Sequence, residues 1–504
     1  GIRDDLVTGV QTCALPILAI WIALSMDGCE LVVQGSVTRI FKLTTDPNDS
    51  SPSLSWDEIE SLSSNPLFAG KSWKWSDRPW ALTDEVLQFL ADLGNAGLSF
   101  FRALERLYLK SADDQKILRN RDVRAPWVAQ YLDAGKPDWL VHHARSKNVL
   151  GALPPVLRPD LLPTRDGFAL TEWDSVPGGI GLTDQLGRFY LKDDAPAIAQ
   201  AFGEALVLQA GELGRSAQFA ILVSEESATY RPEMEWLAEE LKSSGLQVLV
   251  GNPNEVSFSG DYAYLEGVQL NVIYRFWELF DPEVSQMPEF ARCVEAGNLV
   301  VTPGMRPFLE EKLSLALLHH PRLVEYWREN LSKQEREILS QTVPVSWIVD
   351  PAPVPPGALI DGPLVGGKSL AEWMDLAGAS KKERSLVLKA SGFHETAWGA
   401  RSVVVGEDVS TEEWRAALSD ALQQFPNPLS ILQQFRKPVS MEHPVYNDNG
   451  ELGGMKGRLR LSPYYFATEA GISLCGALAT FCPADKKIIH GMRDGALLPC
   501  KTGD

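Results

Sequence analysis

Two short apolar segments separated by a turn signal constrain the fold of this chain more than any other stretch. Residues 156–162 and 168–175 are rich in the apolar residues typical of β-strands. Between them, Arg165-Asp166-Gly167 is a sequence typical of a hairpin turn. The sequence therefore predicts an antiparallel hairpin, with these three residues as its loop and Thr164 paired with Phe168.

The polar side chains of this hairpin indicate a cation site. In the predicted register Asp160 lies opposite Glu172, and Arg158 lies opposite Asp174. Residues two apart on a strand share a face, so Glu172 and Asp174 project the same way. Carboxylates crowded on one face repel one another unless a cation lies among them, and oxygen ligands favour Mg²⁺ or Mn²⁺ over zinc. We predict a divalent metal site at Asp160, Glu172 and Asp174; the alternative is a solvated acidic hairpin.

A glycine-rich segment follows the second strand. In the run DSVPGGIGLT, the glycines at 178, 179 and 181 leave room for backbone N–H groups to approach an anion. A metal, an arginine and such a loop together suit a bound polyphosphate. Gly178, Gly179 and Gly181 are therefore predicted to lie against the phosphates of a bound ligand, which the family resemblance described below makes a nucleotide.

Composition limits the class of protein. A chain of 504 residues that is 45% hydrophobic can bury a large core, and its length predicts two to four domains. Its net charge of −19 argues against a nucleic acid or an anionic membrane surface as a partner, although a pocket for a nucleotide can be locally basic. The six cysteines show no CxxC spacing, which favours a reducing cytoplasm.

The first residues look foreign to the rest of the chain. Residues 1–17 closely resemble translated sequencing-adapter read-through, so we set residues 1–25 aside and expect a native start near Met26. The apolar stretch 14–24 is too short to cross a bilayer, and we find no longer one.

Helical and strand-like patterns continue along the chain. Residues 83–109 and 307–318 are predicted helices, and strands alternate with helices after residue 216, which predicts a small, mainly parallel sheet. The Pro- and Gly-rich residues 344–367 are predicted to form a linker or loop.

Two further segments are candidates for phosphate binding. Lys389 ends an apolar strand just before Ser391-Gly392, where it could reach phosphate oxygens; the alternative is a surface lysine. Residues 362–369 fit the Walker A pattern G-x-x-x-x-G-K-[ST], but only a weak strand at 358–360 precedes them. A P-loop ATPase therefore stays an alternative, against a flexible loop.

In this order, the hairpin, the β-α-β block and the lysine strand resemble the circularly permuted ATP-grasp family, which includes the synthetase domain of glutathionylspermidine synthase. The likeness covers about residues 150–495. The family pattern R-x-D followed by E-x-N is matched by Arg158-Pro-Asp160 and Glu172-Trp-Asp174, with Asp174 in place of asparagine. DSVPGGIGLT looks like the glycine-rich segment of uncharacterised bacterial relatives, and Tyr274-Arg275 resembles a Y-R element of the family.

The resemblance also implies roles for residues in the second half of the chain. FLEEKLSLALL is similar to a helix with a nucleotide-contacting lysine, which gives Lys312, and LVLKASG to the phosphate-lysine strand, which gives Lys389. LQQF gives Gln433 near the adenine, and RLRLSPYYF gives Arg460 as an inward arginine. Alanine follows Lys389 where many relatives have proline, and the family's glutathione- and polyamine-binding residues have no counterparts that we can locate.

The fold implied by the resemblance is α/β (α+β), a circularly permuted ATP-grasp with a small parallel-sheet pre-ATP-grasp domain. Residues 26–150, which precede the likeness, are predicted to be a mixed or helical N-terminal region. The regions that the resemblance implies are the hairpin and glycine loop of the core (151–215), the pre-ATP-grasp domain (216–310), and the nucleotide-binding lid with the rest of the core (311–504).

The activity implied is ligation of a small-molecule carboxylate to an amine through an acylphosphate, with ATP and Mg²⁺. The metal is assigned to Asp160, Glu172 and Asp174, the phosphates to Lys312 and Lys389, and charge stabilisation to Arg158, with Arg460 as a second catalytic arginine. The competing interpretation is an ATP-grasp-like protein that binds nucleotide or a partner without ligating anything.

Overall fold

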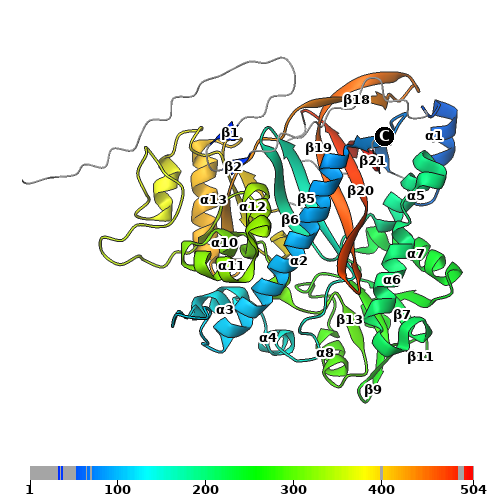
Figure 1. The fold of residues 1–504 in the computed structure, drawn as a ribbon, viewed down its shortest axis with the longest axis horizontal. Coiled ribbons are helices and arrows are strands. Elements are labelled where there is room, and N and C mark those ends of the chain that lie inside the picture. Colours follow the sequence, from blue (N-terminus) through cyan, green and yellow to red (C-terminus); the bar gives the residue numbers. More distant parts are fainter. Residues whose placement is uncertain are drawn as a thin grey trace, which may run out of the picture. The chain divides into compact units, whose positions relative to one another are not determined.

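The structure, a computed structural model, describes residues 32–33, 36–37, 53–63, 65–68, 71–397, 401–485 and 493–502 (Figure 1). The chain divides into two compact units, residues 1–40 and 41–504. In the first, β1 (Val32–Val33) pairs antiparallel with β2 (Ser36–Val37). The read-through assigned to residues 1–25 lies outside the described residues. All elements named below belong to the second unit.

The largest sheet has eight strands, in the order β3-β21-β20-β19-β5-β6, with β18 beside β19 and β4 beside β21. Its strands come from three of the regions predicted from the sequence, namely 26–150, 151–215 and 311–504. The boundaries of these regions stay predictions. The strands are β3 (Ser72–Lys74), β4 (Trp80–Leu82), β5 (Val156–Thr164), β6 (Gly167–Asp174), β18 (Met441–Tyr446), β19 (Leu452–Thr468), β20 (Gly471–Pro483) and β21 (Arg493–Thr502).

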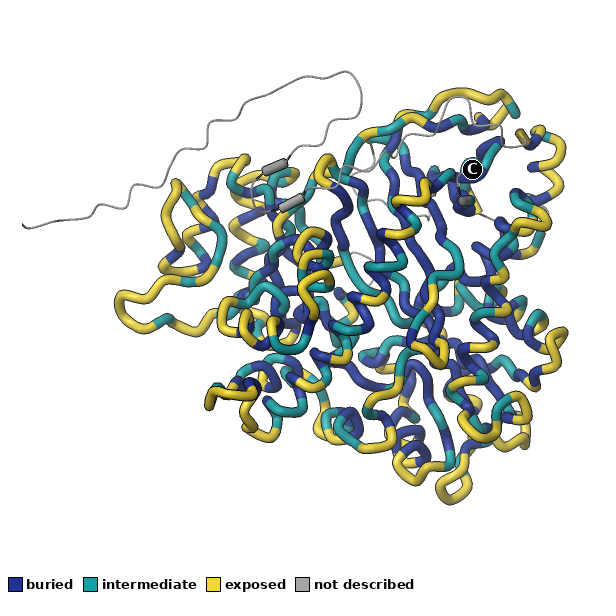
Figure 2. The backbone as a smooth tube through the Cα atoms, in the orientation of Figure 1, coloured by how far each residue is buried: buried dark blue, intermediate teal, exposed yellow. Residues whose placement is uncertain are grey.

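The long helix α2 (Asp84–Ala112) lies across one face of this sheet (Figure 1). Thr83 is its N-cap, and the Thr83 hydroxyl accepts a hydrogen bond of 3.3 Å from the backbone N–H of Val86, as expected for a helix that begins at this threonine. The apolar side of α2 packs into a core with Leu161, Leu461 and Ala479 of the sheet. Figure 2 shows this buried centre, with exposed residues along the outer turns and loops.

The opposite face of the sheet is divided between an apolar and a polar part. Side chains alternate along β19, so Leu461 faces α2, whereas Arg460 and Ser462 face the other way. Farther along the same face, Tyr464 and Phe466 pack against α5 (Ile180–Leu191) and α6 (Ile198–Gln209). Helices therefore cover one end of this face, and polar side chains occupy the other.

A second sheet is wholly parallel, which confirms the prediction for this region. Its order is β13-β12-β7-β8, and α7 (Arg231–Ser243) and α8 (Met287–Glu295) connect β7 to β8 and β12 to β13. The strands are β7 (Gln218–Val223), β8 (Gln247–Gly251), β12 (Val272–Phe276) and β13 (Val300–Thr302). A small antiparallel sheet of β9 (Ser257–Ser259), β10 (Tyr262–Leu265) and β11 (Val268–Gln269) lies between β8 and β12 in the sequence.

A third sheet, here called the lid sheet, is antiparallel with the order β14-β17-β15-β16. Its strands are β14 (Ser346–Val349), β15 (Leu386–Ala390), β16 (Val404–Val405) and β17 (Ser430–Gln434), and α13 (Thr411–Gln424) packs on it through the buried Trp414. The prediction that residues 344–367 form only a linker was wrong at its start, because β14 there pairs with β17.

The predicted helix over 307–318 is broken into α9 (Pro307–Glu310) and α10 (Leu313–His319). At the break, the buried Glu311 is extended, forms an ion pair of 2.5 Å with Lys136 and accepts a hydrogen bond from the Ser391 hydroxyl. The N–H of Lys312 donates to the carbonyl of Ser391 at 3.0 Å. The prediction of a continuous helix was wrong, because the backbone N–H of Lys312 donates to Ser391 instead of to a carbonyl of the preceding turn, and the side-chain partners of Glu311 hold it in an extended conformation. The remaining α-helices are α1 (Trp56–Ser63), α3 (Pro126–Asp133), α4 (Asp138–Ala144), α11 (Val324–Asn330) and α12 (Lys333–Thr342).

The Walker-like stretch 362–369 has no P-loop architecture. Residues 358–360 are not a strand, and a 3₁₀ segment (Trp373–Gly378) follows in place of an α-helix. Gly366 and Gly367 have φ of +58° and +74° in a tight, exposed turn closed by Val365 and Lys368. No helix among the described residues combines the length and the apolar character needed to cross a membrane.

Candidate active site

At its polar end the hairpin has the predicted pairing of residues, but its loop is shorter than predicted and one strand contains a bulge. Thr164 pairs with Gly167, so the loop is one residue shorter than predicted. A β-bulge between Asp160 and Leu161 then leaves Thr171 as an extra residue on β6 and restores the pairing of Asp160 with Glu172. The Thr171 hydroxyl donates to the carbonyl of Asp160 at 3.1 Å. The three-residue loop was therefore wrong, while the relative placement of the polar side chains is confirmed.

A cavity of about 930 Å³ opens between this hairpin, the lid sheet and the parallel sheet. It brings together most of the residues predicted from separate parts of the sequence; Gly179 and Gly181 do not line it. The predicted residues that do are Arg158, Asp160, Glu172, Asp174, Gly178, Lys312, Lys389, Gln433 and Arg460.

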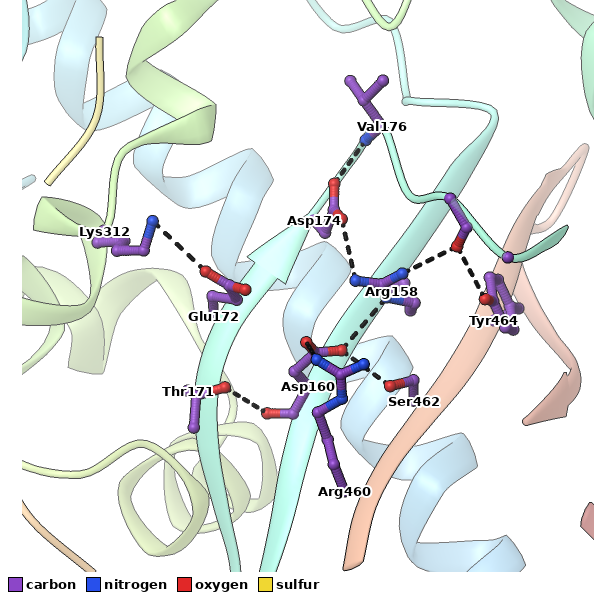
Figure 3. Close-up of polar contacts among 12 residues, drawn as sticks. Arg158, Asp160, Thr171, Glu172, Asp174, Val176, Lys312, Arg460, Ser462 and Tyr464 are labelled. Atoms are coloured by element: carbon purple, nitrogen blue, oxygen red, sulfur yellow. Dashed lines mark hydrogen bonds and ion pairs between the residues drawn. The ribbon is translucent and has the colours of Figure 1, made fainter. Parts of the chain in front are cut away.

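Asp160 lies at the floor of the cavity between two arginines (Figure 3). Its carboxylate is 3.2 Å from Nε of Arg158 and 3.1 Å from Nη1 of Arg460, and it accepts a hydrogen bond of 2.9 Å from Ser462. Burial acts to raise the pKa of Asp160, but the two arginines and Ser462 hold it below its ordinary value. Asp160 is therefore ionised and neutralised by protein groups.

Asp174 is in a different electrostatic position. It pairs with Nη2 of Arg158 at 3.1 Å and accepts the backbone N–H of Val176 at 2.9 Å. Burial nevertheless raises the pKa of Asp174, and Glu172 and Asp160 raise it further, against the opposing effect of Arg158. Glu172 has Lys312 as its ion-pair partner, at 3.4 Å. At Asp174, therefore, burial and the neighbouring carboxylates outweigh the arginine and disfavour the negative charge.

This donor set fits a magnesium ion that a polyphosphate brings with it. Among the described residues, no three acidic, histidine or cysteine side chains are close enough to hold a metal by themselves. Mg²⁺ is usually bound by one or two carboxylates together with phosphate oxygens and water. Glu172 and Asp174 both line the cavity, and each is paired with a single basic side chain, so they suit that role. Metal binding by Asp160, Glu172 and Asp174 stays a prediction.

Lys389 connects the lid sheet to the hairpin. The buried Nζ donates to the carbonyl of Thr171 and to Oε1 of Gln433, both at 2.9 Å. Burial, with a smaller effect from Lys312, lowers the pKa of Lys389 to about 7, although Glu172 acts to raise it. Lys312 donates to the carbonyl of Ala397 at 2.9 Å. Both lysines therefore lie in the cavity wall with their ammonium groups close to Glu172.

The glycine-rich loop is held by a carboxylate that the sequence analysis missed. Glu233 of α7 accepts the N–H of Gly179 at 3.0 Å and that of Gly181 at 2.8 Å. A Cβ on Gly178 would lie 2.2 Å from the ring of Tyr230, so close packing already requires glycine there. In this structure the N–H groups of Gly179 and Gly181 donate hydrogen bonds to the carboxylate of Glu233. Phosphate binding by the loop stays a prediction.

The carbonyl of Gly178 has a role of its own, because it accepts hydrogen bonds from Nη1 of Arg158 at 2.9 Å and from the Tyr464 hydroxyl at 3.0 Å. The loop thereby helps to orient Arg158.

Two further carboxylates in the cavity wall were not found from the sequence. Glu310 forms an ion pair with the fully buried Arg275 and accepts Ser175 at 3.4 Å. Glu278 follows β12 and lines the cavity. Neither belongs to a motif with a recognisable spacing, and only the tertiary structure brings them to the hairpin.

No protein-family model matches the chain, and no curated protein matches it. Among solved structures, a glutathione synthetase-like effector from Globodera pallida superimposes with a TM-score of 0.54 at 13% identity, over 89% of this chain and 95% of that chain. A gamma-glutamylcysteine synthetase-like protein from Methylobacillus flagellatus KT gives a TM-score of 0.39 at 12% identity, over 73% of this chain and 84% of that chain. The likeness to the first shows that the two proteins share a mixed α/β fold over most of their lengths.

Proposed function

We propose that the protein is an ATP- and Mg²⁺-dependent ligase that joins a small-molecule carboxylate to an amine through an acylphosphate. The observation that carries this proposal is the convergence of acidic, arginine and lysine side chains on one cavity of about 930 Å³, which can hold a nucleotide together with small substrates. The fold shared with a glutathione synthetase-like protein supports it.

The proposed chemistry follows from where the charges lie. Magnesium, bound at Glu172 and Asp174, would neutralise phosphate charge. Lys312 and Lys389 would hold phosphate oxygens from the side of the cavity where both ammonium groups lie. Charge-assisted contacts of this kind position reactants and stabilise charge as it develops.

Arg158 and Arg460 line the same cavity beside Asp160. In the first step a substrate carboxylate oxygen attacks the γ-phosphorus, and ADP leaves. In the second the amine nitrogen attacks the acyl carbon, inorganic phosphate leaves, and the nitrogen loses a proton. The arginines would stabilise the negative oxygens of both steps.

Calorimetry with ATP, with and without Mg²⁺, and release of ADP over a panel of carboxylates and amines test the proposal. We expect binding that requires Mg²⁺ and ADP release that requires both substrate types. Glu172→Ala should lower ADP release by about 10²–10³-fold, the loss typical of removing a stabilising group of this kind, with the melting temperature unchanged.

Lys368→Ala is the matched control, because Lys368 lies in the exposed Walker-like turn. It should leave both measurements unchanged. Nucleotide binding without ADP release under any substrate pair would contradict the ligase and favour a nucleotide-binding protein, while loss of binding in Lys368→Ala alone would favour the P-loop.

A further inference from the structure

One wall of the cavity is built by the carboxyl ends of two parallel strands. Ser227 and Tyr230 follow β7, and residues 276–280 end and follow β12. The chain proceeds from β7 to β8 on one side and later to β12 on the other, so the strand order reverses between β7 and β12. In open parallel sheets, ligands bind in the crevice outside the carboxyl ends of the strands at this reversal point. The topology of the sheet therefore marks this wall as a place where a ligand binds. The residues of the wall are different from those assigned to the nucleotide.

Glu278 is the carboxylate of this wall that lacks a partner. Asp174 pairs with Arg158, Glu172 with Lys312, and Glu310 with Arg275. Glu278 has no ion pair and no side-chain hydrogen bond within the described part of the chain. Burial, together with Glu310 and Asp174 nearby, raises the pKa of Glu278 to about 8, against the opposing effects of Arg275 and Lys312. The surroundings thus oppose its negative charge, and a bound cation would relieve that opposition.

Aromatic residues line the cavity together with Glu278. Phe276, Trp277, Phe280 and Tyr230 line the same wall, and the rings of Tyr230 and Phe276 are 5.4 Å apart. The indole nitrogen of Trp277, which is 1% exposed, also has no hydrogen-bond partner among the described residues. Aromatic faces attract organic cations and cover hydrocarbon, whereas Mg²⁺ requires oxygen ligands. No group of three metal-ligating side chains in the described chain includes Glu278, so an organic cation is favoured over a metal.

We propose that Glu278 binds a positively charged amine of the acceptor substrate, against the aromatic wall formed by Tyr230, Phe276 and Phe280. The substrate class is an aliphatic ammonium compound, whose charge pairs with the carboxylate while its hydrocarbon covers the rings. This assignment rests on the proposed ligase function, because it puts the acceptor close to Asp174 and Lys312, where phosphoryl transfer is placed.

Ligand-observed NMR with n-butylammonium chloride tests the assignment, and n-butanol serves as the neutral probe of equal size. Butylammonium should bind the wild-type protein, and butanol should not compete with it. In Glu278→Gln, butylammonium should bind at least about tenfold more weakly, as expected when a hydrogen bond to a charged group is lost.

Glu407→Gln is the matched control, because Glu407 also lines the cavity but follows β16 of the lid sheet. It should bind butylammonium like the wild type. Glu278→Asp keeps the charge on a shorter side chain and should retain part of the affinity, and circular dichroism checks that each variant folds. Unchanged binding in Glu278→Gln, equal loss in Glu407→Gln, or displacement by butanol would overturn the assignment.

Two further titrations separate this assignment from the ligase proposal. A non-hydrolysable ATP analogue with Mg²⁺ should bind Glu278→Gln as tightly as the wild type, and Mn²⁺ binding in its presence should also be unchanged. Loss of Mn²⁺ in Glu278→Gln would make Glu278 a metal ligand and overturn the amine site. Amine binding that depends on Glu278, in a protein that binds no nucleotide, would support the amine site and overturn the ligase.

Discussion

Lys389 is a buried cation whose hydrogen-bond acceptors are both neutral. The carbonyl of Thr171 and the amide of Gln433 satisfy its ammonium geometrically, but neither carries a charge. Glu172 is the nearby group that favours the protonated form, and Lys312 opposes it. With a pKa of about 7 in the ligand-free protein, the side chain changes charge within the physiological range. An incoming phosphate would favour the charged form.

Nucleotide affinity should therefore depend on pH through Lys389. Below about pH 7 the lysine is already charged, whereas above it a proton must be taken up on binding, so the affinity should fall by up to tenfold per unit as pH rises. Calorimetry with ADP and Mg²⁺ between about pH 6 and pH 9, in two buffers of different ionisation enthalpy, measures both the affinity and the proton uptake. Lys389→Arg, always charged, should show a flatter profile. Equal slopes in the two proteins would contradict the role of Lys389.

The sequence could predict the residues that sit on strands but not those whose environment is made by other elements. Arg158, Asp160 and Glu172 were found because strand periodicity and pairing fix which side chains share a face. Glu233 and Glu278 were missed because their importance comes from what surrounds them: glycine N–H groups for Glu233, and burial beside two other carboxylates for Glu278. No local spacing encodes either environment.

At the scale of elements, the hairpin shows why a correct pairing can follow from an incorrect turn. The predicted three-residue loop is one residue too long, and the bulge at Thr171 compensates for that residue. A bulge leaves few signals in a sequence, since it depends on what the extra residue meets. Here the carbonyl of Thr171 accepts Lys389 of the lid sheet, so the irregularity provides a contact between two sheets. The break at Glu311 has the same kind of cause, because its partners Lys136 and Ser391 come from distant segments.

Glycine within α2 adjusts the distance between this helix and the hairpin. A Cβ on Gly97 would lie 2.5 Å from the ring of Trp173, the residue between Glu172 and Asp174. Gly97→Ala should therefore destabilise the protein by about 1–3 kcal/mol through overpacking, although alanine favours a helix. Asn95→Ala, at an exposed position of the same helix, should stabilise it by a few tenths of a kcal/mol.

Chemical denaturation and ADP release measure the two consequences of Gly97→Ala. Displacement of Trp173 should also lower ADP release, because its neighbours Glu172 and Asp174 line the cavity. A Gly97→Ala protein as stable and active as the wild type would show that the helix and the ring can separate without cost, and that the glycine has no packing role.

At the scale of the whole described fold, the main sheet unites segments from both ends of residues 41–504. The edge strands β3 and β4 pair with β21 and with no other strand in the described residues, and both pairings are parallel. The apolar side of α2 likewise packs on strands from the hairpin and from the C-terminal part. The sequence patterns predicted the hairpin and the helix over 83–109 but neither β3 nor β4. Such patterns also hold no record of which distant strands pair, so the role of region 26–150 stayed open.

A fragment of residues 41–150 should therefore not fold alone. It would expose the core side of α2, with Leu90, Leu93 and Phe100, and would leave β3 and β4 without partners. We expect a circular dichroism spectrum without a cooperative thermal transition, and a soluble complex when residues 151–504 are co-expressed. The intact protein serves as the reference, and we expect residues 41–150 and 151–504 to unfold in it in a single thermal transition. If the fragment unfolded cooperatively by itself, residues 41–150 would be an independent domain, because their hydrophobic core would be complete without the strands of residues 151–504.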